Sequence, residues 1–213
     1  MVTELCERIR PRCGVLAGDV SGRRGALTAM RHADLLTPSE PELRDAAGDY
    51  GDALAAVVWR LLGQTRSRAA AITMGPEGLI AFEPRDDKPR TRDPGHMPES
   101  AHRSRLLGEH VPAMSPHAAD ELGCGDALLA TAALVLAAGG GLLEAAYIGS
   151  AAASIQSRRL GNEPVDAATV RRELTRVASA HLTLASPGLI ETRGLGLPHT
   201  GQTARKPAGR ESA

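Results

Sequence analysis

The most informative stretch of this sequence is Asp120-Glu121-Leu122-Gly123-Cys124-Gly125-Asp126, which stands directly before the most apolar helical segment of the chain. Its two glycines bracket one small residue, which lets the backbone turn sharply into a helix. The unpaired N–H groups and the positive dipole end of that helix favour a bound anion. Asp126, at the helix start, is then placed to take a proton from an attacking hydroxyl. From the pattern alone, a glycine-rich loop in which Asp126 only caps the helix is the simpler alternative.

Short apolar strands and amphipathic helices alternate along the rest of the chain. Strands are expected over residues 14–17, 33–36, 69–73, 79–82 and 110–114. Helices are expected over residues 3–10, 41–62, 126–138, 142–158 and 167–180, the last of them capped by Asp166. The glycine-rich turn at residues 74–78 predicts a hairpin. The alternation as a whole predicts an α/β layered domain with a largely parallel sheet.

The chain divides into one domain, residues 1–185, and a flexible C-terminal tail, residues 186–213. The tail is predicted because its composition turns to Gly, Pro, Thr and Arg without any periodicity. Within the domain, residues 84–107 are rich in Pro, Arg, Asp and His and contain little apolar surface. This composition predicts an exposed excursion outside the core.

Composition and charge limit the partners. The chain has 25 basic and 25 acidic residues and only 2% aromatic side chains, so it lacks the basic footprint and stacking rings expected of a nucleic-acid-binding protein. Its longest uncharged stretch, residues 127–143, is interrupted by glycines and too short to span a bilayer, so no membrane partner is expected. The cysteines form no Cys-x-x-Cys motif and the N-terminus has no signal peptide, which indicates a cytoplasmic protein.

The opening segment resembles the motif D-x-T-G-A-G-D of the PfkB (ribokinase-like) carbohydrate kinases, with matches at Asp120, Gly123, Gly125 and Asp126. Further matches follow the family's order within residues 14–170: L-L-T-P-S-E-P-E at 35–42, I-T-M-G-P-E-G at 72–78, V-P-A at 111–113, L-A-A-G at 136–139, and A-A-A through R-L-G at 151–161. Within this family, the chain is most similar to the heptose-phosphate kinase domain of bifunctional ADP-heptose synthase. The resemblance implies a ribokinase-like three-layer α/β/α fold, of which the chain would hold the C-terminal half only.

The resemblance also implies a role for each matching residue. Asp126 would be the catalytic base, and the N–H groups of Gly123, Cys124 and Gly125 would form an anion hole. The magnesium-bound phosphates and the nucleotide would contact a further set of positions, which comprises Ser39, Glu42, Thr73, Gly75, Gly78 and Gly161. Glu42 and Asp120 are the metal candidates, Glu42 toward Mg²⁺ and Asp120 toward a monovalent cation beside the anion loop. ATP and Mg²⁺ are therefore the expected cofactors.

Some positions depart from the family pattern. Ser39 replaces asparagine, Leu122 replaces threonine and Cys124 replaces alanine. Arg158 stands where glycine is usual, and it is expected to place a cation near the nucleotide. Cys124 has a second interpretation as a nucleophile whose pKa is lowered by the helix N-terminus.

Two functions remain open. One is the ATP-dependent phosphorylation of a sugar or sugar phosphate, with D-glycero-D-manno-heptose 7-phosphate as the substrate implied by the resemblance. The other is a non-catalytic nucleotide-binding or interaction remnant of a carbohydrate kinase. Complete members of the family begin with a glycine-rich N-terminal half that supplies the sugar pocket. A homodimer or a complementing subunit is therefore expected to cover the exposed edge of the sheet.

Overall fold

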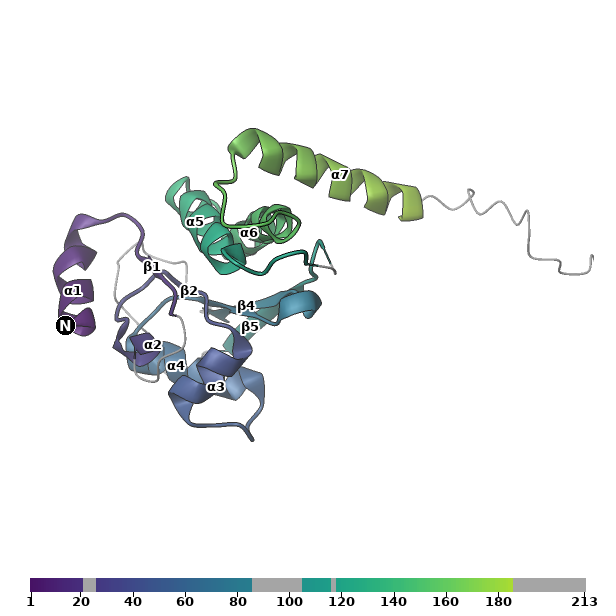
Figure 1. Cartoon of the computed structure of the whole chain (residues 1–213). Helices are drawn as coiled ribbons and strands as arrows, with labels where there is room; N and C mark the ends of the chain where they lie inside the picture. Colours follow the sequence, from purple (N-terminus) through teal and green to yellow (C-terminus); the bar gives the residue numbers. More distant parts are fainter. Residues whose placement is uncertain (21–25, 86–104, 116–117, 186–213) are drawn as a thin grey trace, which may run out of the picture.

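The computed structural model describes residues 1–20, 26–85, 105–115 and 118–185, and these form a sheet between two helical layers (Figure 1). The predicted tail, 186–213, and most of the predicted excursion, 86–104, lie outside the described residues. The ends of that predicted excursion belong to strands, because residues 83–85 pair with residues 105–107 across the sheet. Within the described part of the chain, no helix is long and apolar enough to cross a membrane.

The sheet contains five strands that lie side by side in chain order. They are β1 (Ala17–Gly18), β2 (Leu35–Leu36), β3 (Ala70–Thr73), β4 (Leu79–Arg85) and β5 (Arg105–Val111). Strands β1, β2 and β3 pair in parallel, whereas β3, β4 and β5 pair antiparallel. The turn between β3 and β4 contains the short 3₁₀ helix η2 (Gly75–Glu77), which confirms the predicted hairpin.

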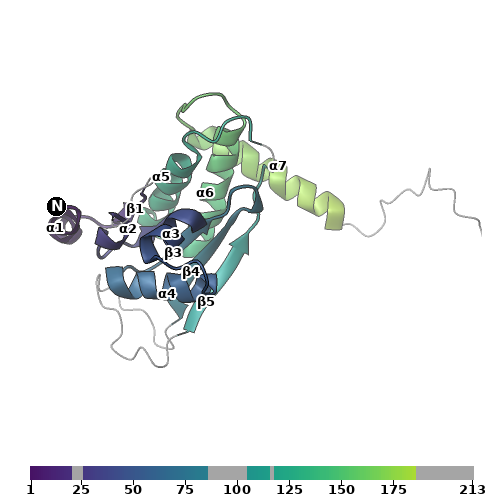
Figure 2. The same ribbon diagram turned by 60° about the horizontal axis from the view of Figure 1, so that its bottom comes forward.

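Helices cover both faces of the sheet, which confirms the predicted three-layer α/β architecture. One layer contains α2 (Ala26–Ala29), α3 (Glu40–Ala47) and α4 (Leu54–Thr65), and the other contains α5 (Cys124–Ala137) and α6 (Leu142–Ser157) (Figure 1). Figure 2 shows α6 running along the sheet beside α5. The chain begins with α1 (Val2–Ile9) and η1 (Arg10–Arg12), and α7 (Ala167–Ala185) packs on the outside of α6.

Each face of the sheet has its own apolar core, because successive strand residues point to opposite sides. Leu36 and Ile72 face the layer of α3 and α4, where they pack with fully buried Leu43, Val57, Val58 and Leu62. Their strand neighbours Leu35 and Ala71 face the layer of α5 and α6, together with Leu79, Val111, Leu128, Ala132, Ala145 and Ala146. The alanines on α5 and α6 let these two helices approach the sheet and each other closely.

The helix predicted over residues 41–62 is wrong as a single element. It is broken into α3 and α4 at Gly48, which adopts a left-handed conformation (φ 63°) that ends α3. Asp49 then accepts hydrogen bonds from the N–H groups of Gly51 (3.1 Å) and Asp52 (3.0 Å), which holds a turn before α4. The apolar spacing runs through this turn, so periodicity alone did not reveal the break.

Candidate active site

The N-terminus of α5 has exposed N–H groups and no side-chain cap. Gly123 is the N-cap, in a left-handed conformation (φ 77°), and its carbonyl accepts the first helical hydrogen bond from Ala127 (2.9 Å). The Cys124 N–H donates at 3.3 Å to the carbonyl of Glu121. The N–H groups of Gly125 and Asp126 belong to the first helical turn, where the helix itself offers no carbonyl partner. These two N–H groups are therefore placed to donate to an anion, whereas the Cys124 N–H, which was also expected in the anion hole, is already hydrogen-bonded to Glu121.

The loop before α5 is tied to the turn that follows α6. One carboxylate oxygen of Asp120 accepts from the N–H of Leu122 and the other from the N–H of Gly161, both at 3.0 Å. These hydrogen bonds lower the pKa of Asp120, since they stabilise its charged form. The side-chain amide of Gln156, a fully buried residue on α6, donates to the carbonyls of Leu122 (3.2 Å) and Gly161 (2.5 Å). The loop is thus fixed from the α6 side.

The backbone conformation at Gly123 favours glycine. A Cβ atom at this position would lie 2.2 Å from the Oδ1 atom of Asn162, and its φ of 77° is one that side chains rarely adopt. Gly123 therefore lets the loop before α5 and the turn after α6 approach each other.

Three carboxylates from separate segments gather beside this helix N-terminus. Asp19 follows β1, Glu42 lies in the first turn of α3 after β2, and Asp126 lies in the first turn of α5. A Cβ atom on Gly125 would be 3.4 Å from the Oδ2 atom of Asp19. Burial, together with the charges of Glu42 and Asp126, raises the pKa of Asp19 to about 6, although a hydrogen bond from the N–H of Val20 lowers it. The site therefore holds concentrated negative charge that a cation would stabilise.

We expect the charge on Asp19 to destabilise the protein at neutral pH. An acid with a raised pKa in the folded state binds more protons when folded, so its contribution to stability falls as the pH rises from 3.8 to about 6. The variant Asp19→Asn is therefore expected to have a higher Tm than the wild type above that window, with the gain disappearing at about pH 4. Thermal unfolding followed by circular dichroism across this pH range measures the effect.

Asp120 provides the matched comparison for Asp19. Its pKa is lowered by backbone hydrogen bonds, so its charged form stabilises the fold, and Asp120→Asn is expected to lower Tm at neutral pH. A higher Tm for Asp19→Asn and a lower Tm for Asp120→Asn would support the conclusion that the ionised form of Asp19 destabilises the fold. The same pH dependence in the wild type and in Asp19→Asn would contradict it.

Ser39 and Glu42 form a capping box at the start of α3. The Ser39 hydroxyl and its N–H both donate to the Oε2 atom of Glu42, at 2.7 and 2.8 Å, and the Glu42 N–H donates back to the hydroxyl at 3.4 Å. Pro41 occupies the first turn, where its missing N–H is not needed. The carboxylate of Glu42 is thus oriented by local backbone geometry toward the end of β2.

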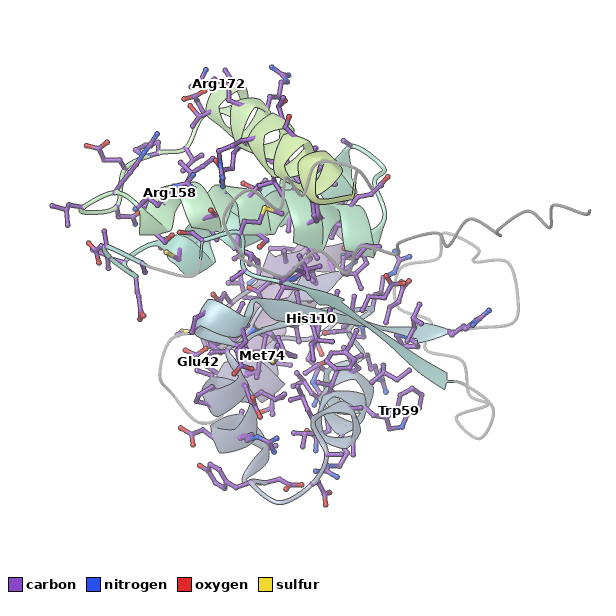
Figure 3. The ribbon with its side chains drawn as sticks, turned by 90° about the vertical axis from the view of Figure 1, so that its right-hand side faces the viewer. Glu42, Trp59, Met74, His110, Arg158 and Arg172 are labelled. Atoms are coloured by element: carbon purple, nitrogen blue, oxygen red, sulfur yellow. The ribbon has the colours of Figure 1, made fainter. Side chains whose placement is uncertain are left out.

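Thr73, Gly75 and Gly78 lie on the hairpin between β3 and β4, next to the start of α3. The Thr73 N–H donates to the carbonyl of Pro38 (3.1 Å), which links the hairpin to the segment before Ser39. Figure 3 accordingly shows Glu42 and Met74 next to each other. Gly78 has a φ of 93°, and a Cβ atom there would lie 2.2 Å from the carbonyl oxygen of Val111. The contact that the structure gives Gly78 is therefore close packing against the end of β5.

The structure changes the interpretation of the departures at Cys124 and Arg158. Burial and the charges of Glu121 and Asp120 raise the pKa of the Cys124 thiol, which disfavours the thiolate that a nucleophile requires. Arg158 does not extend toward the loop before α5; its guanidinium pairs with buried Glu173 on α7 at 2.8 Å. Among the described residues, no group of three or more His, Cys, Asp and Glu side chains is arranged to hold a metal by itself.

Asp19 is an acidic residue of this site to which the sequence analysis gave no role. It follows a short apolar strand, as Ser39 and Glu42 follow the next one, and parallel neighbouring strands end at the same edge of a sheet. A polar residue directly after each of two parallel strands is the pattern that would have indicated it.

The chain and its fold match a known protein family. Residues 14–165 match the family described as pfkB family carbohydrate kinase, and the chain belongs to this family. It is 31% identical over 176 residues to the bifunctional protein HldE of Azorhizobium caulinodans, which covers 82% of this chain and 32% of that protein. It is 30% identical over 174 residues to HldE of Azotobacter vinelandii, which covers 81% of this chain and 32% of that protein.

Solved structures confirm the ribokinase-like fold. Ribokinase from Thermotoga maritima superimposes with a TM-score of 0.58 at 20% identity, over 80% of this chain and 52% of that protein. Phosphofructokinase-2 from Escherichia coli, solved in complex with potassium, gives a TM-score of 0.62 at 17% identity, over 83% of this chain and 52% of that protein. The chain thus spans about half the length of these structures and about a third of the HldE relatives.

Proposed function

We propose that the chain takes part in the ATP-dependent phosphorylation of a sugar or sugar phosphate. The observation that carries the proposal is the convergence of the uncapped α5 N-terminus with exposed Asp126 and with the acidic pair Asp19 and Glu42. Membership of a carbohydrate kinase family supports a sugar acceptor in general. The similarity to HldE and to a heptose-phosphate kinase domain favours D-glycero-D-manno-heptose 7-phosphate as the acceptor.

The geometry suits phosphoryl transfer because this reaction depends on positioning and charge stabilisation more than on covalent chemistry by the protein. The N–H groups of Gly125 and Asp126 would donate to phosphate oxygens as negative charge develops on them. The Asp126 carboxylate, in the same helical turn, would accept the proton of the attacking hydroxyl. Thr73 and Gly75, on the hairpin beside α3, would lie along the nucleotide.

The acidic residues fit the expected metal ions. Mg²⁺ is usually bound by one or two carboxylates together with substrate phosphates, and Asp19 and Glu42 supply such a pair. The raised pKa of Asp19 reflects burial and repulsion that a divalent cation would relieve. Mg²⁺ bound there would neutralise charge on the transferred phosphate.

Oxygen atoms suited to a monovalent cation gather around Asp120. Its carboxylate lies beside the turn of Gly161, and the nearby Gln156 Oε1 atom is buried without a hydrogen-bond partner in the described part of the chain. An unpaired buried oxygen gains a partner when a cation binds. The potassium complex of phosphofructokinase-2 from Escherichia coli supports a cation of this kind.

A second candidate function, nucleotide binding without catalysis, is favoured by the capping box at α3. The Ser39 hydroxyl, which stands where the family has an asparagine amide, is already hydrogen-bonded to Glu42 and so is less available to organise magnesium-bound phosphates.

Strand β1 forms an edge of the sheet, with β2 as its neighbour. We propose that a complementing subunit or a second copy of the chain pairs with this edge.

The decisive experiment measures ATP binding and ADP formation separately. The purified chain is assayed with Mg-ATP and heptose 7-phosphate, fructose 6-phosphate or ribose, alone and mixed with the N-terminal segment of an HldE relative. ADP formation that depends on one sugar supports the kinase. Mg-ATP binding without sugar-dependent ADP formation in either mixture supports the non-catalytic alternative, and the absence of both would contradict both proposals.

A further inference from the structure

A positively charged site, separate from the candidate active site, lies between the C-terminal end of α6 and the N-terminal half of α7. A cavity of about 300 Å³ opens there, lined by Ile155, Arg158, Arg159, Thr169, Arg172, Glu173 and Arg176. Figure 3 shows Arg158 and Arg172 at this end of the molecule, away from Glu42 and Met74. The cavity is therefore separate from the acidic cluster beside α5.

One carboxylate at the base of the cavity is fully committed to two of the arginines. Glu173 is only 6% exposed. Its carboxylate accepts hydrogen bonds from the guanidinium of Arg176 at 2.8 and 3.1 Å and contacts the guanidinium nitrogens of Arg158 at 2.8 and 3.0 Å. Hydrogen bonds from Arg176 and then from Arg158 lower the pKa of Glu173 to about 2, against burial that raises it. The three side chains form a fixed network that joins α6 to α7.

The other two arginines contact neutral oxygens instead. Arg172 donates to the hydroxyl of Thr169 at 2.7 Å, and Arg159 donates to the carbonyl of Pro164 at 3.5 Å. Neither forms an ion pair within 4 Å of a carboxylate among the described residues, although Arg172 lies near enough to Asp166 to lower its pKa. Four guanidinium groups thus face two carboxylates, Glu173 and Asp166, which leaves two positive charges in excess.

We propose that this cavity binds a phosphate dianion, either as inorganic phosphate or as the phosphate group of a small organic molecule. Two excess positive charges match the charge of the ligand, and guanidinium groups donate paired hydrogen bonds to phosphate oxygens. Arg159 and Arg172 supply these donors, because the Thr169 hydroxyl already donates its one hydrogen to Asp166 at 2.7 Å. The cavity is larger than a phosphate ion needs, so a substituent can lie against Ile155.

The test uses the full chain carrying Gly125→Val, which closes the site at α5 so that any remaining binding reports the cavity. Calorimetry measures inorganic phosphate, a sugar phosphate and the same sugar without phosphate. Replacing both Arg159 and Arg172 with Gln is expected to weaken phosphate binding about tenfold or more, since each loses a charge-assisted hydrogen bond. The matched control replaces two exposed arginines, Arg12 and Arg171, with Gln, and neither of them lines the cavity.

The Glu173 network remains intact in the double variant, so its Tm without phosphate should equal that of the control. A chemical measurement on the unmodified chain gives independent evidence: phosphate should slow the reaction of Arg159 and Arg172, but not of Arg12 and Arg171, with an arginine-directed reagent. Tighter binding of the sugar phosphate than of inorganic phosphate identifies an organic ligand, and the reverse identifies the free ion. Equal affinities in both double variants, or no protection of Arg159 and Arg172, would overturn the proposal.

Discussion

Replacement of Asp126 with Asn is expected to lower kcat by about 100- to 10,000-fold in any sugar-dependent phosphorylation by this protein. The amide keeps the shape of the side chain in the first turn of α5, but it cannot accept the proton of the acceptor hydroxyl. The affinity for Mg-ATP should change little, because the N–H groups of the helix start remain. Steady-state kinetics and ATP titrations with purified protein measure both quantities.

A control for this variant lies on the same loop. Glu121 is exposed and outside the cluster of Asp19, Glu42 and Asp126, so Glu121→Gln removes the same charge without touching the proposed base. It is expected to keep kcat near the wild-type value. Equal activity of Asp126→Asn and Glu121→Gln would show that Asp126 is not the base.

Replacement of Gly125 with Val is expected to abolish nucleotide binding at α5. A Cβ atom at this position already approaches the Oδ2 atom of Asp19 to 3.4 Å, and the two further methyl groups would occupy the space of a phosphate. Hydrogen exchange measures the loss. In the wild type, Mg-ATP is expected to protect residues 73–78 and 123–126, whereas in the variant this protection should disappear.

The helix itself must remain folded for this result to be informative. Ala130→Val places the same β-branched side chain on an exposed position of α5, far from its N-terminus, and serves as the control. It should retain full protection by Mg-ATP. Protection confined to other segments in the wild type would show that the nucleotide binds elsewhere.

Most of the fold follows from local sequence features. The strands alternate or concentrate apolar residues, Pro41 and Ser39 specify the start of α3, and the residues around Gly75 and Gly78 specify the hairpin. The break at Gly48 was missed because the apolar spacing continues into α4. The pairing of β4 with β5 along residues 83–85 and 105–107 was missed because it joins segments that are separated in the sequence and poor in apolar residues.

The sequence predicted only those parts of the candidate site that are formed by residues close together in the chain. The turn at Gly123 is a local motif whose position was predicted from sequence. The family resemblance singled out Ser39 and Glu42 as site positions, and the structure shows that they also form a capping box. The place of Asp19 beside Gly125 depends on contacts between distant segments, as does the pairing of Arg158 with Glu173 on α7. Such contacts depend on the tertiary arrangement, which a residue pattern does not specify.

The missing side-chain cap on α5 has a practical consequence for handling this protein. A phosphate-bearing ligand that accepts hydrogen bonds from the free N–H groups of α5 would bind the folded state and not the unfolded state. Its presence would therefore shift the unfolding equilibrium by mass action. At a concentration of 100 times its Kd, such a ligand adds about 2.7 kcal/mol to the free energy of unfolding. We therefore expect the melting temperature to rise with the concentration of such a ligand, and protein purified with phosphate to melt at a higher temperature than protein purified without it.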